Sequence, residues 1–476
     1  MITVDFENRG SVGLCEYLYN SIKNQILKGT LKADEKLPSK RSLAEHLGIS
    51  VITVQNAYEQ LIEEGYLYSI EKKGFFVTNI HPEEIQNTNN RFADSSKSIS
   101  EEKLNPPAEK IEYFADFASN STGYEKFPFN LWAHEMREVL NSGNERLLQR
   151  SAANGILELR EAIAKHLCEF RNMTVSPEQI IIGAGTETLY TMVVQLLGQD
   201  KIYAVEDPGY HKVASVISLN GAKCVPVKID ENGLRPDELE KAKAHIAHIS
   251  PAHHFPTGTV MPVRRRRELL SWAEKSLNRY IIEDEYDSEF RFNGKPLQTL
   301  FSSDQNGKVI YINTFSKTLA PSFRLSFMIL PSTLIPLFRQ KLGFYSCPVS
   351  VFEQFTLAVF MQKGHYGKHL IRMKNYYRTL RNSLINAIAQ SALSSIAEIQ
   401  EEEAGLHFLL KTQPSESMDA IRKKLAEQKI NLPLLADFYY QNVPEESLFT
   451  FIINYSGIKK ERIKEAVARL EKALLP

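Results

Sequence analysis

The stretch YINTFSKTLAPSFRLSF, Tyr311 to Phe327, places one lysine, Lys317, among small hydroxyl residues directly after a β-rich run. One arginine, Arg324, follows seven residues later. A lysine amine can form a Schiff base with an aldehyde, and a nearby arginine suits a phosphate. A lysine at a strand end is more often a solvated surface residue, so the stretch needs support from the rest of the chain.

The surrounding sequence alternates short apolar runs with amphipathic helical patterns. The runs are continuous and bounded by Gly, Pro, Asp or Ser: QIIIGAG, KIYAVEDPG, AHIAHISPA, RYIIEDEYD and KVIYINTFS. Continuous apolar runs suit central strands that are covered on both faces. The pattern predicts an α/β domain with a mainly parallel sheet and functional residues at the strand ends.

Residues at these strand ends match the needs of pyridoxal 5′-phosphate (PLP), the aldehyde cofactor that lysine holds. Asp284 would keep the pyridine nitrogen protonated, and Tyr286 would reach the phenolic oxygen. Tyr210, after a Pro-Gly turn, would cover the ring. A strand-ending Asp is often only a cap, so each signal is weak alone and their order along the chain carries the prediction.

The cofactor phosphate needs backbone amides at a helix start, hydroxyls and a cation. The sequence offers a strand-to-helix turn and hydroxyls around the lysine: Gly185, Thr186, Thr314, Ser316 and Arg324. The turn GAGT is generic by itself. Together with Lys317 these residues complete the predicted cofactor site.

The first eighty residues show a different pattern, in which three helices precede a short hairpin. Ser39 and Ser50 are expected N-caps of the second and third helices, and Gly48 suits the stop between them. YLYSIEKKGFFV would form a two-stranded wing. The pattern predicts an α+β winged helix-turn-helix.

In such a fold the early residues of the third helix enter the major groove of DNA. Thr53 and Gln55 would meet base edges, and a second set would meet phosphates: Ser39, Lys40, Arg41, Lys72 and Lys73. Residues 1–80 hold 9 Lys plus Arg against 10 Asp plus Glu, so the segment is not basic overall. A small three-helix domain for protein contact is the alternative.

A polar segment separates the two patterns, TNIHPEEIQNTNNRFADSSKSISEEKLNPPAEK, with few apolar residues and no period. It predicts a flexible linker. The expected organisation is a DNA-binding domain at 1–78, a linker at 79–113 and a PLP-binding effector domain at 114–476.

The composition bounds the class of protein. The formal net charge is zero and 43% of the residues are hydrophobic. The chain shows no long apolar run and no signal-peptide layout at its start, so a cytoplasmic location is expected. The four cysteines match no metal or disulfide spacing, and no metal site is expected.

The segment from LPSKRSLAEHLG to KKGFFV resembles the winged helix-turn-helix of GntR-type regulators, and the resemblance implies DNA contacts by Arg41, Thr53 and Gln55. That family usually has an arginine where this chain has Val51. From about residue 114 the chain looks like a fold-type-I aminotransferase, which implies the PLP roles given above for its motif residues. Joined, the two resemble the MocR subfamily of GntR-type transcriptional regulators.

The resemblance implies promoter DNA and a small effector as partners, and a head-to-tail homodimer. GabR-type members hold an effector carboxylate with two arginines, and here Lys212 and Gly457 take those positions. Lys212 and His254 are the candidate effector contacts. We expect PLP itself, or an amino compound that forms an aldimine, to be the effector, with γ-aminobutyrate excluded.

Two other functions stay open on the sequence. A working PLP-dependent aminotransferase would need a substrate-carboxylate arginine near the last strand, where Gly457 stands. A DNA-binding repressor with a cofactor-free second domain is disfavoured, because Lys317, Asp284, Tyr286 and Arg324 are all present. The prediction is a transcriptional regulator with an aminotransferase-like domain rather than an enzyme, and residual transaminase activity stays open.

Overall fold

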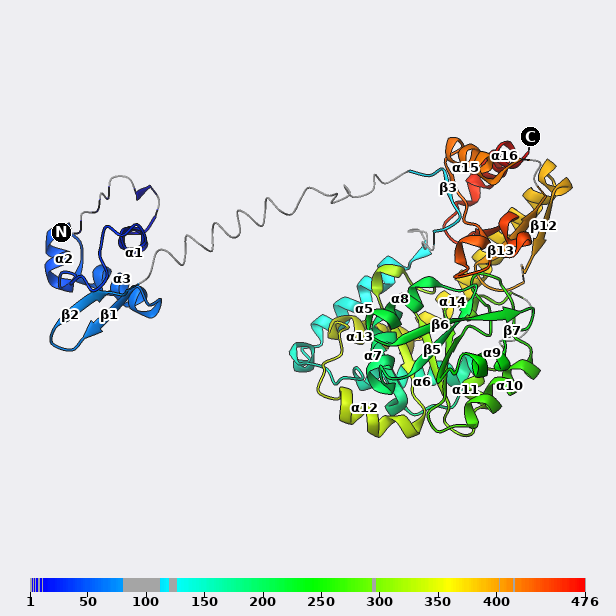
Figure 1. Ribbon diagram of the computed structural model, residues 1–476, viewed down its shortest axis with the longest axis horizontal. Helices are drawn as coiled ribbons and strands as arrows, with labels where there is room; N and C mark the ends of the chain where they lie inside the picture. Colours follow the sequence, from blue (N-terminus) through cyan, green and yellow to red (C-terminus); the bar gives the residue numbers. More distant parts are fainter. Residues whose placement is uncertain are drawn as a thin grey trace. The chain divides into compact units, whose positions relative to one another are not determined.

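The structure, a computed structural model, describes residues 2, 4, 6, 9–10, 12–79, 112–119, 126–292, 297–401, 403–413 and 416–475. It divides into two compact units, residues 1–110 and 111–476, each with its own core (Figure 1). The predicted linker at 79–113 lies outside the described residues, except for residues 79, 112 and 113.

The first unit has three helices and one hairpin. Their bounds are α1 (Leu14–Leu27), α2 (Lys40–Leu47), α3 (Val51–Glu63), β1 (Leu67–Ile70) and β2 (Gly74–Val77). The Ser39 side chain accepts from the Ser42 amide at 3.2 Å, and the Ser50 side chain accepts from the Thr53 amide at 3.1 Å. Both predicted N-caps and the predicted winged helix-turn-helix are therefore confirmed.

The second unit is built on an eight-stranded sheet in the order β4-β11-β10-β9-β8-β5-β6-β7. Neighbouring strands are parallel from β10 through to β6, and the pairs β4–β11, β11–β10 and β6–β7 are antiparallel. The bounds are β4 (Ile180–Gly183), β5 (Ile202–Asp207), β6 (Lys223–Asp230), β7 (Gly233–Leu234), β8 (Ile246–Ile249), β9 (Tyr280–Glu285), β10 (Val309–Thr314) and β11 (Ser326–Ile329). The predicted mainly parallel sheet is confirmed.

Helices cover both faces of this sheet (Figure 1). β4 lies at an edge of the sheet, not at its centre as predicted, yet Ile180 and Ile182 belong to one buried core and Ile181 to another, so its successive side chains are buried on both faces. The helices of this layer are α5 (Phe129–Asn141), α6 (Leu157–Arg171), α7 (Thr186–Leu197), α8 (His211–Leu219), α9 (Pro236–Lys241), α10 (Val263–Glu274), α11 (Leu300–Ser303), α12 (Ile335–Leu342) and α13 (Val351–Gln362).

The rest of the second unit packs around a small antiparallel sheet in the order β12-β13-β15. Its elements are β3 (Ala115–Asp116), α14 (His365–Ala389), β12 (Ala397–Gln400), β13 (His407–Thr412), α15 (Met418–Glu427), β14 (Ile430–Asn431), β15 (Thr450–Asn454) and α16 (Ile463–Leu474). The first strand of the unit, β3, packs with this C-terminal part, because it pairs in parallel with β14.

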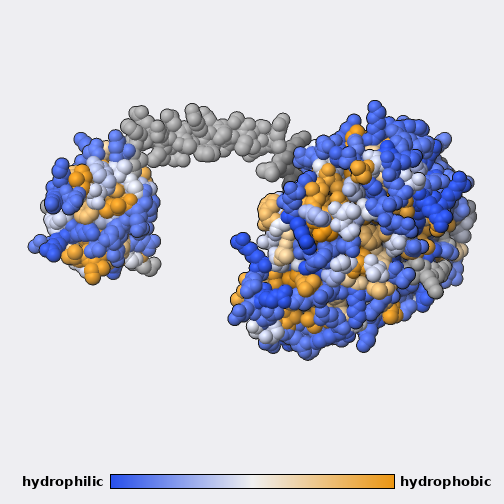
Figure 2. All heavy atoms as spheres, turned by 90° about the horizontal axis from the view of Figure 1, so that it is seen from below, coloured by the Kyte–Doolittle hydropathy of each residue, from blue (hydrophilic) through white to orange (hydrophobic). Residues whose placement is uncertain are grey.

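Short 3-10 helices connect these elements: η3 (Glu145–Leu148), η4 (Pro177–Gln179), η5 (Ser288–Phe290), η6 (Pro321–Phe323), η7 (Ser332–Leu334), η8 (Ala392–Ser395), η9 (Leu435–Phe438), η10 (Glu445–Phe449) and η11 (Lys460–Arg462). Within the described ranges, no helix is both long and apolar enough to span a bilayer. The face drawn in Figure 2 is mainly hydrophilic on both units, with scattered apolar patches.

Candidate cofactor and DNA-binding sites

A cavity of about 320 Å³ opens at the carboxyl ends of β5, β8, β9 and β10. Residues predicted from five separate sequence segments meet in its wall: Thr186, Tyr210, Lys212, His254, Asp284, Tyr286, Thr314, Ser316, Lys317 and Arg324. Gly185, the other predicted member, forms the turn before α7. The cavity therefore brings together the residues that the sequence singled out.

Lys317 follows β10 and lines this cavity. Burial lowers the pKa of its amine to about 8, although the negative charge of Asp287 opposes the shift. A larger share of the amine is then unprotonated near neutral pH than for an exposed lysine. An unprotonated amine is the form that attacks an aldehyde.

Asp284 offers a carboxylate with one oxygen in use and one unused. Its Oδ2 accepts a hydrogen bond from the Tyr190 hydroxyl at 2.6 Å, and His248 Nε2 lies 3.6 Å from the same oxygen. Its Oδ1 is buried and has no hydrogen-bond partner. A buried acceptor without a donor is costly, so this oxygen fits a ligand that brings an N–H, as a protonated pyridine nitrogen does.

The opposite end of the cavity is suited to an anion but is closed by an acid. A Cβ on Gly185, whose φ is +88°, would lie 2.2 Å from the Arg324 guanidinium, so only glycine allows this approach. Arg324 forms an ion pair with Glu187, and Lys212 donates to the same carboxylate at 2.5 Å. The sequence analysis did not anticipate Glu187.

The electrostatics of Glu187 follow from these two cations. Burial raises the pKa of its carboxyl, but hydrogen bonds from Lys212 and Arg324 outweigh burial and lower that pKa to about 2. Thr314 and Ser316 add hydroxyls beside it, since Thr314 Oγ1 donates to Ser316 Oγ at 2.9 Å and accepts from the Ser316 amide at 3.1 Å. A phosphate at Arg324 would compete with Glu187 for the guanidinium.

Two histidines lie near the middle of the cavity. His254 is 3% exposed, its Nδ1 lies 2.7 Å from Thr257 Oγ1, and its Nε2 lies 3.4 Å from Glu206 Oε2. Burial and the neighbouring histidines lower the pKa of His254 to about 3, and burial raises the pKa of the Glu206 carboxyl to about 8. Both groups are therefore neutral at pH 7.

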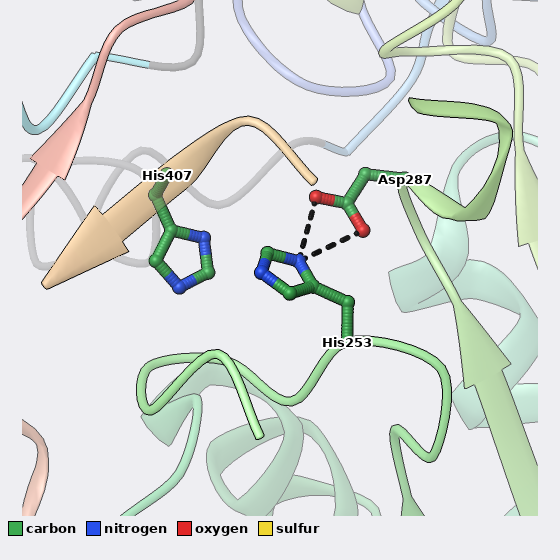
Figure 3. Close-up of side chains that lie close together, drawn as sticks. All are labelled: His253, Asp287 and His407. Carbon is green, nitrogen blue, oxygen red and sulfur yellow. Dashed lines mark hydrogen bonds and ion pairs between the residues drawn. The ribbon is translucent and has the colours of Figure 1, made fainter. Parts of the chain in front are cut away.

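His253, rather than His254, contacts the predicted phenolic-oxygen partner Tyr286. The Tyr286 hydroxyl lies 3.1 Å from His253 Nδ1, which also lies 3.0 Å from Asp287 Oδ2 (Figure 3). The Leu406 amide donates to the same Asp287 oxygen at 3.1 Å, and the His407 ring lies tilted by 42° beside His253, with ring centroids 4.4 Å apart. This buried network joins Tyr286 to the loop before β13.

The cavity offers few cations for a substrate carboxylate. Among the described residues of its lining, the lysines and arginines are Lys212, Lys317 and Arg324. Gly457 is exposed and does not line it. Tyr210, the predicted ring cover, is 50% exposed at the cavity wall.

In the first unit, the predicted DNA contacts lie on exposed surface or at helix starts. Arg41, Lys72 and Lys73 are exposed. Gln55 Nε2 donates to Glu59 Oε1 at 2.7 Å, and Lys40 Nζ lies 3.3 Å from the same oxygen. The acid Glu59 therefore holds two predicted DNA contacts in the free protein.

The start of α3 also exposes two apolar side chains: Val51, for which the sequence suggests a contact with a thymine methyl group, and Ile52, which it does not single out. Ile52 is 70% exposed and Val51 is 42% exposed. Thr53 is tied to the N-cap, because its Oγ1 lies 2.8 Å from Ser50 Oγ. An exposed isoleucine at this point suits the methyl group of a thymine.

Fold and site together define a winged helix-turn-helix chain with a fold-type-I aminotransferase-like second unit. Residues 14–77 match the family model described as "Bacterial regulatory proteins, gntR family", and residues 114–470 match "Aminotransferase class I and II". A similar solved structure, an archaeal alanine:glyoxylate aminotransferase, has a TM-score of 0.67 at 22% identity over 82% of this chain and 95% of that one. This likeness shows the fold.

Relatives that match along the whole chain are named as regulators. The protein named "Uncharacterized HTH-type transcriptional regulator YhdI" of Bacillus subtilis is 34% identical, over 100% of this chain and 98% of its own. The protein named "Probable rhizopine catabolism regulatory protein MocR" of Rhizobium meliloti is 29% identical, over 96% of this chain and 93% of its own. The pyridoxine biosynthesis regulator PdxR of Corynebacterium glutamicum is 28% identical, over 89% and 88%.

The chain belongs to the MocR subfamily of GntR-type transcriptional regulators, in which a DNA-binding unit precedes an aminotransferase-like unit.

Proposed function

We propose that this chain is a transcriptional regulator that binds promoter DNA through residues 1–78 and PLP through the cavity at Lys317. The observation that carries the proposal is the pairing, across one cavity, of Lys317 with the unpartnered buried Asp284 Oδ1. PLP, when bound, supplies an aldehyde for Lys317 and a pyridine nitrogen for Asp284. The alternative function, a working aminotransferase, is not favoured, because the relatives that match along most of the chain are named as regulators.

The chain's own residues have distinct roles in this proposal. Asp284, oriented by Tyr190, holds a proton at the pyridine nitrogen, and Tyr286 donates toward the phenolic oxygen. Gly185, Thr186, Thr314, Ser316 and Arg324 would receive the phosphate, and Tyr210 would cover the ring. Lys212 and His254 would contact an effector beyond the cofactor.

PLP itself is the proposed effector, with a second amino compound as the alternative at the same lysine. The scarcity of cations in the described lining supports the exclusion of γ-aminobutyrate, whose carboxylate would need an arginine. An allosteric coupling of about 1–3 kcal/mol would change operator affinity roughly 5- to 150-fold. Cytoplasmic location and a head-to-tail homodimer, with the linker at 79–113 between the domains, complete the proposal.

The test is one purification followed by two measurements. The purified protein should show a visible absorption band from bound PLP and should shift its own promoter fragment, with PLP altering the shift. Lys317→Ala should remove the band and the response to PLP but keep basal DNA binding. Lys464→Ala, on an exposed position of α16, is the matched control and should behave as wild type.

Different outcomes reject different parts of the proposal. The proposal of a PLP-responsive regulator would be refuted by a colourless protein whose promoter shift is unchanged both by added PLP and by the Lys317→Ala substitution. Turnover of amino-donor pairs at ordinary enzyme rates would favour an aminotransferase. A saturable spectral change with γ-aminobutyrate would remove the exclusion of that effector.

The DNA contacts can be tested separately on the same fragment. Arg41→Ala should weaken binding to all sequences alike, because a phosphate contact carries no base information. Gln55→Ala and Ile52→Ala should instead relax sequence preference. If all three variants lost the same affinity for specific and for random DNA, the proposal that α3 contacts the bases would be wrong.

A further inference from the structure

A second cavity of about 180 Å³ lies in the aminotransferase-like unit, and none of its lining residues lines the Lys317 cavity. Residues of α6, η5, β10, β11, α13 and α14 form its wall. The wall is mostly apolar: Phe170, Phe315, Phe327, Met361, Leu370 and Ile371. Phe170 is 43% exposed and Ile371 is 58% exposed, so the cavity reaches the surface beside α6 and α14.

Two acceptors in this wall have no donor. Glu289 Oε1 accepts from Asn313 Nδ2 at 3.2 Å, but Glu289 Oε2 is buried and has no hydrogen-bond partner. Ser288 Oγ is also buried and unpartnered. Both residues line the same cavity, and unsatisfied buried acceptors are rare because each costs free energy. A ligand with N–H donors would satisfy both.

The cations in the wall of this cavity donate no hydrogen bond to Glu289, and Arg171 acts on it only through its charge. Arg171, whose side chain is 6% exposed, forms its ion pair with Glu285. Lys374 lies in the wall, yet the charges that act on its amine are those of Arg378 and Arg291. Burial raises the pKa of the Glu289 carboxyl, and the charge of Arg171 only partly opposes this. The carboxyl is therefore poorly compensated.

We propose that this cavity binds a small organic cation with an apolar body. Its head, an amidinium or ammonium group, would donate to Glu289 Oε2 and Ser288 Oγ. The body of the ligand would lie against the aromatic and aliphatic wall. A cavity of about 150 Å³ is large enough for benzene in another protein, so one ring fits here. The site does not depend on the cofactor and stands apart from the proposed function.

A structural connection joins this second cavity to the first. Ser288 and Glu289 belong to η5, and the residue before them, Asp287, contacts His253 (Figure 3). Asp287 also accepts from the Leu406 amide on the cofactor side. Arg171 and Ser288 also line a small crevice with His253 and Asp287. A ligand held by Ser288 and Glu289 therefore acts on the residue that orients Tyr286 through His253.

Benzamidine is the probe, because its amidinium offers several N–H donors on one ring and forms no stable bond with an aldehyde. Calorimetric titration of the full chain, with and without PLP, should show one site per chain with a Kd below about 1 mM. PLP should not abolish this binding. Glu289→Gln, which keeps an acceptor for Asn313, should weaken it at least tenfold.

Two further variants keep the test decisive. Glu353→Gln changes another partly buried carboxyl, on α13, that does not line the cavity, and should bind benzamidine as wild type. Ile371→Trp fills the exposed mouth without touching a buried core and should block binding even if Glu289→Gln proves unstable. The proposal would be overturned if the wild type showed no saturable binding of benzamidine. It would also be overturned if Glu289→Gln and Ile371→Trp both bound benzamidine as tightly as wild type, or if PLP displaced it fully.

Discussion

The two ends of the Lys317 cavity differ in how they are prepared for a ligand. At the Asp284 end, Tyr190 holds one carboxylate oxygen and leaves the other buried and unpartnered. At the Arg324 end, the arginine forms an ion pair with Glu187, and both side chains are partly exposed. A ligand at the Asp284 end gains a hydrogen bond, whereas a ligand at the Arg324 end competes with Glu187 for the guanidinium. The stronger selection for the cofactor is therefore expected at the Asp284 end.

The largest expected effect tests that end directly. Asp284→Asn removes the negative charge that a protonated pyridine nitrogen needs, and a hydrogen bond to a charged group contributes about 1.5–3 kcal/mol. PLP affinity should fall by roughly 10- to 150-fold. Equilibrium titration of the visible absorption band measures this. Asp200→Asn, at an exposed surface position, should have no effect; an unchanged affinity in Asp284→Asn would contradict the comparison.

The second prediction concerns the lysine between the two ends. Because burial lowers the pKa of Lys317 to about 8, its reactive neutral form increases as the pH rises toward that value. The rate of covalent PLP uptake by apoprotein should rise about 50-fold from pH 6 to pH 8 and then level off. Stopped-flow absorbance gives this rate, and a rise that continues to pH 10 would indicate an ordinary exposed lysine.

A smaller loss is expected when only the orientation of Asp284 is disturbed. Tyr190→Phe removes the hydroxyl that donates to Asp284 Oδ2, which should weaken PLP binding about fivefold, in line with roughly 1 kcal/mol per hydrogen bond. Tyr203→Phe is the matched control, since the Tyr203 hydroxyl donates to the Gly198 carbonyl outside the cavity. Equal losses in both variants would point to stability rather than to the site.

The smallest effect should have the opposite sign. Glu187→Gln frees Arg324 and Lys212 for the phosphate, and a partly exposed ion pair contributes at most about 1 kcal/mol, so PLP should bind about three- to fivefold more tightly. Glu178→Gln is the control. Like Glu187, Glu178 forms ion pairs with two cations, in this case Arg160 and Arg339, but it lies outside the cavity. Weaker binding in Glu187→Gln would show that the acid supports the site.

Much of the fold follows from local sequence. Ser39 and Ser50 cap their helices through their own nearby amides, and the continuous apolar run at Ile180 to Ile182 is enough to predict a strand buried on both faces. Lys317, Asp284 and Tyr286 were also predictable, because each stands at the end of such a run. These features depend on residues within a few positions of one another.

The tertiary structure decided which distant groups became partners. Tyr190 within a helix and Glu187 in its first turn show no local sign that they meet Asp284 and Arg324. The contacts of His253 with Asp287 and Tyr286 likewise depend on segments that only folding brings together. Periodicity records which face of an element is buried, whereas hydrogen bonds across elements depend on their packing.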